Sequence, residues 1–150
     1  MWPRPYHNIL SATDFIALEA DTLKKEISLA IDAALDKKAL DLVLLDLQGI
    51  SSFTDYFLIC HGTSIRQTQA IADSIDLRLR AIKSHGRIEG YQPGDWICMD
   101  YGDFVVHVFT HDKREYFDLE RLWGDAPRVA VEGAAEPVAR RRRKSAAKSD

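Results

Sequence analysis

Cys60 and Arg66, in the stretch CHGTSIRQ, have the C-x5-R spacing with which one class of phosphatases places a thiolate nucleophile and a phosphate-gripping arginine. A loop that runs from a strand into a helix presents free backbone N–H groups, which bind anions and lower the pKa of a thiol. That chemistry also needs an acid to protonate the leaving oxygen, and the sequence assigns no acid to this role. Because Cys60 ends an apolar run, we favour a packed, protonated thiol and keep a C-x5-R phosphatase as the alternative.

The same turn invites a second enzymatic interpretation. Nucleotidyltransferases place a Gly-Ser turn before a helix and a D-x-D pair on the next strand. Here GTS opens a helix, but the following run RIEGY carries only Glu89, and Asp73 and Asp76 lie within the helix. Two-metal phosphoryl transfer requires paired carboxylates on adjacent outward positions. The sequence therefore indicates no catalytic metal site of this kind.

The histidines and one strand-end carboxylate are the remaining candidates for metal binding or catalysis. His61, His107 and His111 lack the compact spacing of metal ligands, and His107 stands in a valine-rich run, so hydrogen-bonded structural histidines are favoured. Asp46 closes an apolar run and is interpreted as a loop-capping group. We predict no catalytic residue, no metal and no cofactor.

Amphipathic and apolar segments must position these residues. Apolar residues recur every three or four positions over 16–35, 64–83 and 114–124, which predicts helices. The helix at 64–83 begins with the S-x-x-Q capping box of Ser64 and Gln67. Short apolar runs bounded by turn residues predict strands at 42–48, 56–61, 86–91, 95–100 and 103–110.

This order of elements predicts an α/β fold with a mixed sheet of about five strands and flanking helices. The helix at 64–83 connects the run 56–61 to the next strand as a crossover, so part of the sheet is expected to be parallel. The runs 95–100 and 103–110 are expected to form an antiparallel hairpin through Tyr101 and Gly102.

Composition and charge narrow the class of protein. With 150 residues, 46% hydrophobic and 29% charged, the chain resembles one ordinary soluble domain, and no apolar run approaches the ~18–20 residues of a membrane span. The start MWPRPYHNIL fits no targeting signal, so we expect a cytoplasmic protein. Of the net charge of −3, residues 126–150 contribute +4 and residues 1–125 contribute −7. Any RNA contact is therefore expected from the basic tail with its RRRRK run.

Three segments together resemble the ribosomal silencing factor family, also called Iojap-like. They are DLVLLDLQGISSFTDYFLICHGTSIRQTQAIADSI, EGYQPGDWICMDYGDFVVHVF and REYFDLERLWGD, and the resemblance covers about residues 18–125. We predict an N-terminal tail at 1–14, the family domain at 15–125 and a disordered basic tail at 126–150.

The resemblance implies a non-catalytic protein of nucleotidyltransferase-like fold that has lost the metal-binding acids. It implies binding to the large ribosomal subunit through large-subunit ribosomal protein fourteen, which blocks subunit joining and represses translation when nutrients are scarce. A role in large-subunit biogenesis and a homodimer in the free state are also implied. We expect no binding to a membrane.

The family pattern also implies where the partner binds. Trp96 is the expected anchor, because a buried aromatic anchor contributes about 2–4 kcal/mol at interface hot spots. Ordinary core packing is the alternative for this side chain. The residues expected to bind the ribosomal protein are Trp96, Ile97, Met99, Asp100, Tyr101, Asp103 and His107.

Overall fold

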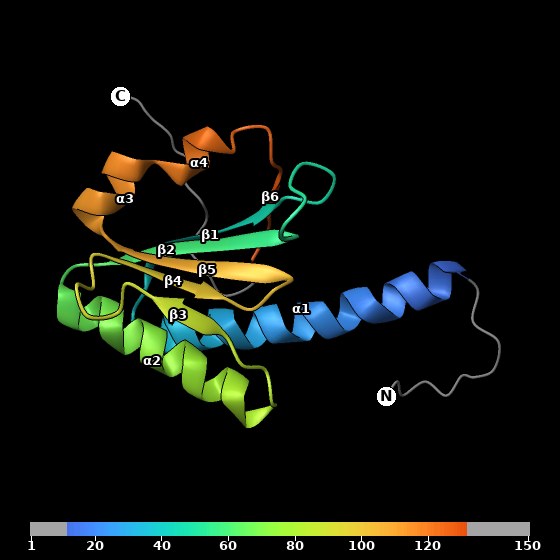
Figure 1. Ribbon diagram of the computed structural model, residues 1–150, viewed down its shortest axis with the longest axis horizontal. Coiled ribbons are helices and arrows are strands. Elements are labelled where there is room, and N and C mark those ends of the chain that lie inside the picture. The colour runs from blue at the N-terminus through green and yellow to red at the C-terminus, as the bar shows by residue number, and fades with distance from the viewer. Residues whose placement is uncertain (1–11, 132–150) are drawn as a thin grey trace.

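A computed structural model describes residues 12–131, with side chains described from residue 23 onward. One six-stranded sheet has the order β3-β4-β5-β2-β1-β6. Figure 1 shows α1 and α2 on one face of this sheet and α3 and α4 on the other. The strands are β1 (Leu40–Asp46), β2 (Tyr56–Gly62), β3 (Arg87–Glu89), β4 (Trp96–Asp100), β5 (Phe104–Thr110) and β6 (Arg128–Val129), and the helices are α1 (Ala12–Asp36), α2 (Ile65–Ala81), α3 (His111–Phe117) and α4 (Leu119–Leu122).

The sheet is mixed, which confirms the predicted α/β class. A parallel pair is present, but its members are β2 and β5, whereas β3, the first strand after α2, lies at the edge. β3, β4 and β5 are joined by antiparallel pairings, so β5 is the strand that returns beside β2. The predicted hairpin is confirmed, and the amide N of Tyr101 donates to the carbonyl of Phe104 at 2.9 Å.

Strand alternation divides the core into two clusters. Along β2, Leu58 packs toward α1 and α2, while its neighbours Phe57 and Ile59 pack toward α3 and α4. Successive strand side chains point to opposite faces, so the continuous apolar run of β2 is explained by helices on both sides. On β4 the same alternation sends Ile97 and Met99 to the α2 face, and Trp96 and Cys98 to the other.

The ends of the domain differ from the sequence prediction. α1 begins at Ala12, inside the predicted N-terminal tail. β6 pairs with β1, Ala126 is buried, and the amide N of Asp46 donates to the carbonyl of Pro127 at 2.9 Å. The sheet therefore has six strands rather than about five, because a segment assigned to the basic tail pairs with the edge of β1. A two-residue strand is too short to leave a periodic pattern, and the RRRRK run lies outside the described residues.

Candidate functional site

The turn around Cys60 is built as a helix start rather than as a thiolate site. The Ser64 hydroxyl accepts from the amide N of Gln67 at 3.1 Å, as the capping box predicts. The Gln67 side chain accepts from the amide N of Thr63 and donates to the carbonyls of Lys37 and Lys38, which ties α2 to the α1–β1 turn. Cys60 is fully buried, and burial raises the pKa of its thiol to about 12. The interpretation of Cys60 as a packed, protonated thiol is confirmed.

Cys60 is expected to resist thiol reagents in the folded protein. At pH 8 a thiol with a pKa of about 12 is ionised in about one molecule in ten thousand, and the side chain has no exposed surface. The variant Cys98→Ser leaves Cys60 as the only cysteine of the 150-residue chain. It should show no labelling by a thiol-specific chromogenic reagent until denaturant is added, when one thiol reacts. Rapid labelling of the native variant would revive the phosphatase alternative.

The histidines and carboxylates within residues 12–131 are dispersed over the fold. Among residues 12–131, no group of three or more His, Cys, Asp or Glu side chains is arranged to hold a metal ion. His61 and His107 are buried and each has a hydrogen-bond partner, which confirms the structural interpretation of both rings. Asp46 caps its loop by accepting from the amide N of Gln48 at 2.9 Å. No helix within 12–131 has the length and apolar content needed to cross a membrane.

A buried arginine fastens α3 and α4 to the sheet. Arg114 donates to both carboxylate oxygens of Glu120, at 3.1 and 2.9 Å, and its Nη1 lies 2.9 Å from Nδ1 of His61. The same guanidinium reaches the carbonyl of Leu40 at 3.3 Å. Burial, followed by the charge of Arg114, lowers the pKa of His61 to about 4. Burial raises the pKa of Glu120, but the hydrogen bond and charge of Arg114 outweigh it and lower that pKa.

Aromatic rings cover much of the sheet face that carries α3 and α4. The Trp96 ring lies 4.5 Å from that of Phe117, and its Nε1 donates to Nδ1 of His107 at 3.1 Å. His107 lies 4.4 Å from Phe57, which in turn lies 5.8 Å from Trp123. Phe53 completes the series at 6.2 Å from Trp123. We call this surface the aromatic face, and its members are Phe53, Phe57, Trp96, His107, Phe117 and Trp123.

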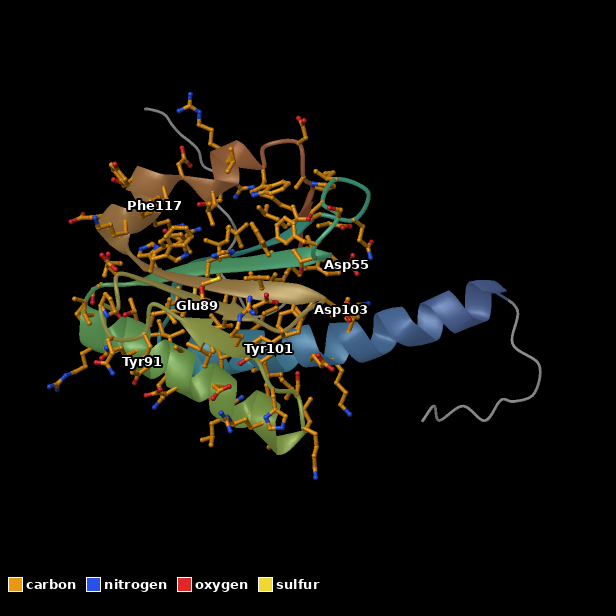
Figure 2. All side chains as sticks on the ribbon, in the orientation of Figure 1. Asp55, Glu89, Tyr91, Tyr101, Asp103 and Phe117 are labelled. Carbon is orange, nitrogen blue, oxygen red and sulfur yellow. The ribbon has the colours of Figure 1, made fainter. Side chains whose placement is uncertain are left out.

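The aromatic face is partly open to solvent. Phe53 is 62% exposed and Phe117 is 40% exposed, while Trp96 and Trp123 are half-buried. Figure 2 shows Phe117 above the sheet, near the end opposite to that of Asp55 and Asp103. The exposed and half-buried rings provide apolar area that a protein partner can bury.

The predicted binding residues differ in their exposure to solvent. Trp96 and Asp100 stand at opposite ends of β4 and are half-buried, and Asp103 is exposed in the hairpin turn. Ile97 and Met99 have no exposed surface, so a direct contact with a partner is wrong for both. The physical reason is alternation: they occupy the positions of β4 that point toward α2.

The side chains of Tyr101 and His107 also make contacts within the fold. The Tyr101 hydroxyl donates to Oδ1 of Asp76 on α2 at 3.1 Å, and its ring stacks on Phe104. Burial, with the nearby charge of Asp76, raises the pKa of this phenol. His107 is 5% exposed, so its predicted direct contact with a partner is wrong for the ring as it lies here. Because it contacts Trp96, it can affect the site through that ring.

Comparison with known proteins identifies the family of this chain. A family model described as "Ribosomal silencing factor during starvation" matches residues 20–150. The chain belongs to the ribosomal silencing factor family. A family member from Halalkalibacterium halodurans, "Ribosomal silencing factor RsfS", is 48% identical over 111 residues, which cover 71% of this chain and 92% of that protein.

Two further similarities bear on the family. "Mitochondrial assembly of ribosomal large subunit protein 1" from Mus musculus is 30% identical over 104 residues, covering 67% of this chain and 46% of that protein. A crystal structure of a protein from Chromobacterium violaceum superposes with a TM-score of 0.66 at 34% identity, covering 76% of this chain and 96% of that one. The predicted resemblance to the ribosomal silencing factor family is confirmed, and this family is not a known class of enzymes.

Sequence reasoning missed several members of the site. Phe53 lies in the β1–β2 loop within the quoted family segment, yet no residue-level argument singled it out. Phe117 and Trp123 were assigned only to a helix, and Arg114 carried no signal because a buried arginine in a polar helix resembles an exposed one. An unusual density of aromatic residues near the end of the domain, in YFDLERLW, was the available indication.

Proposed function

We propose that this chain is a ribosomal silencing factor that binds the large ribosomal subunit through large-subunit ribosomal protein fourteen. Bound there, it blocks joining of the small subunit and represses translation under nutrient limitation. Membership of the family supports this proposal. The observation in the fold that carries it is the aromatic face, with Trp96 braced at one end and Phe53 exposed at the other.

The aromatic face has the properties of a protein-binding surface. Interface hot spots are rich in tryptophan and tyrosine, and they work best when the anchor is held in a well-packed setting. Trp96 packs against Phe109 and Phe117 at ring-centroid distances of 5.2 and 4.5 Å. A ring held in this way loses little side-chain entropy on binding, which favours affinity.

Carboxylates near the β4–β5 turn favour a basic protein partner. The Asp100 side chain is 41% exposed, and Asp103 and Asp55 lie close together because the amide N of Asp55 donates to the Asp103 carbonyl. Such charges attract a basic ribosomal protein and repel RNA phosphates, so they direct the chain to protein rather than to the RNA around it. We therefore place Asp100 and Asp103 at the rim of the interface.

Silencing by this route requires only that the chain occupy its binding site on the large subunit. A folded domain attached to the joining face fills volume that the small subunit must occupy, and no bond is made or broken. The same attachment is compatible with a role in large-subunit biogenesis, which the name of the mouse relative supports. Both roles would use the same surface.

Sedimentation of purified subunits tests the proposed function. The full chain is added to large subunits alone, to small subunits alone and to a joining mixture at fixed magnesium concentration. We expect it to co-migrate with large subunits and to reduce the fraction of joined ribosomes. A chain that stays at the top of the gradient, or that co-migrates with small subunits, would contradict the proposal.

The basic tail is proposed to make a modest contact with ribosomal RNA. Residues 126–150 carry a net charge of +4, and RNA binding of this kind weakens as salt rises because counterions are released. Removing residues 138–150 should therefore weaken subunit binding at low salt by a few-fold and change it little at high salt. Equal affinity of the full and shortened chains at low salt would end this proposal.

The free chain is proposed to be a homodimer, as the family resemblance implies. Sedimentation equilibrium of the free 17.0 kDa chain should then give twice the protomer mass at micromolar concentration. A protomer mass that does not rise with concentration would rule the dimer out.

A further inference from the structure

The hydrogen bond between Trp96 and His107 determines which polar atoms of the two rings remain available. An indole N–H donates only, so Nδ1 of His107, at 3.1 Å, is the acceptor. The proton of the neutral imidazole therefore resides on Nε2. Burial lowers the pKa of His107 to about 4, so the ring is neutral at physiological pH. Both the tautomer and the charge state of His107 are thus fixed by the fold.

Nε2 of His107 is an unusual atom in this core. It is buried, and it has no hydrogen-bond partner among the described residues. A buried donor without a partner carries a free-energy cost, because it has lost its hydrogen bonds to water. An apolar side chain at this position would avoid that cost, yet it would place no acceptor beneath the indole. The histidine supplies one useful atom, Nδ1, and that atom faces Trp96.

Three side chains together leave the Trp96 ring little freedom. Phe109 stacks on it with an interplanar angle of 26°, and Phe117 packs against it at 4.5 Å. These contacts restrict the plane of the ring, while the bond to His107 selects which edge of the indole points inward. The N–H edge is directed at His107, so the part of the ring that faces away from His107 is hydrocarbon.

We propose that His107 is a positioning residue for Trp96, which binds the indole N–H internally so that a partner meets only the hydrocarbon surface of the ring. This inference rests on the proposed function, because it assumes that Trp96 is the anchor. It assigns the partner group at that point to apolar side chains or to the aliphatic stem of a basic one. A partner group that accepts a hydrogen bond from the indole is excluded, since that donor is already used.

A double-mutant cycle tests the positioning role. His107→Leu removes the acceptor, whereas His107→Asn keeps an acceptor oxygen close to the position of Nδ1. We expect His107→Leu to weaken binding to large subunits by about 3- to 10-fold, and His107→Asn to stay within about 2-fold of the wild type. In a Trp96→Phe background, which lacks the N–H, His107→Leu should cause no further loss.

A spectroscopic readout separates positioning from general packing. In protein labelled with ¹⁵N-tryptophan, the indole N–H signal of Trp96, assigned with Trp96→Phe, should move and exchange faster in His107→Leu but not in His107→Asn. An unchanged indole signal in His107→Leu would overturn the inference. His107→Val serves as the acceptor-free variant if His107→Leu does not fold.

Failure of the inference and failure of the proposed function are distinguishable. If Trp96→Ala loses binding while His107→Leu binds like the wild type, the positioning role is wrong and the anchor stands. If Trp96→Ala binds like the wild type, the anchor is wrong, and the role of His107 in recognition is wrong with it.

Discussion

Trp96→Ala is expected to weaken binding of the chain to large ribosomal subunits by about 30- to 1,000-fold, as expected for a hot-spot anchor worth about 2–4 kcal/mol. The indole packs against Phe109, Phe117 and His107, so its removal takes away the half-buried ring and leaves those side chains without their packing partner. Sedimentation titrations with purified large subunits measure the effect, and the fraction of joined ribosomes should rise toward the level without added protein.

Leu77→Ala is the matched control for Trp96→Ala. Leu77 is 72% exposed and lies on α2, which covers the opposite face of the sheet. Its removal deletes a large exposed apolar side chain without touching the aromatic face, so subunit binding should stay within about 2-fold. A Leu77→Ala variant that binds as poorly as Trp96→Ala would move the interface to the α1/α2 face.

Arg114→Met is expected to destabilise the fold by about 3–5 kcal/mol, because removing one partner of a buried ion pair leaves the other charge uncompensated. The Arg114 and Glu120 side chains are only 10% and 18% exposed, and His61 and the Leu40 carbonyl lose the same donor. Urea unfolding measures the change. The double variant Arg114→Met, Glu120→Leu should recover much of the loss, because no unpaired carboxylate remains.

An ion pair with a solvent-exposed arginine provides the control for Arg114→Met. Arg80 donates to Asp76 at 2.8 Å, but its side chain is 59% exposed, so Arg80→Met should cost less than about 1 kcal/mol. Equal losses for Arg80→Met and Arg114→Met would show that the buried network contributes nothing special.

Acid should weaken the Arg114 network. The pKa of Glu120 is lowered from its ordinary value of 4.5, so its contribution is present above pH 4.5 and is lost as the pH falls through the folded-state pKa. The pKa of His61 is lowered from 6.5 to about 4, so the unfolded chain takes up this proton first as the pH falls from 6.5 toward 4. Both groups make the fold less stable in acid.

Local patterns of apolar and turn residues predicted several parts of the fold. The helix at α2, the buried strand β2 and the β4–β5 hairpin all follow from spacing and turn residues. The same alternation, applied to β4, was sufficient to place Trp96 and Ile97 on opposite faces. The family pattern groups Trp96, Ile97 and Met99 as contact residues and takes no account of the strand geometry. For this reason it places Ile97 and Met99 wrongly.

Long-range contacts explain what spacing did not predict. β6 exists because two residues pair with the open edge of β1, and neither Arg128 nor Val129 carries a local signal for that partner. The aromatic face unites the β1–β2 loop, β2, β4, β5 and the α3–α4 segment, so its members are neighbours only after folding. The bond from Trp96 to His107 spans the hairpin in the same way.

Site-specific photocrosslinking identifies the molecule that contacts the aromatic face. Phe117 is 40% exposed beside Trp96, so replacing it with p-benzoylphenylalanine places a crosslinker at the edge of the aromatic face, and position 77 on α2 serves as the control. After irradiation with large subunits, the proposed function predicts one dominant crosslink from position 117 to large-subunit ribosomal protein fourteen and none from position 77. Crosslinks from position 117 only to ribosomal RNA or to other ribosomal proteins would contradict it.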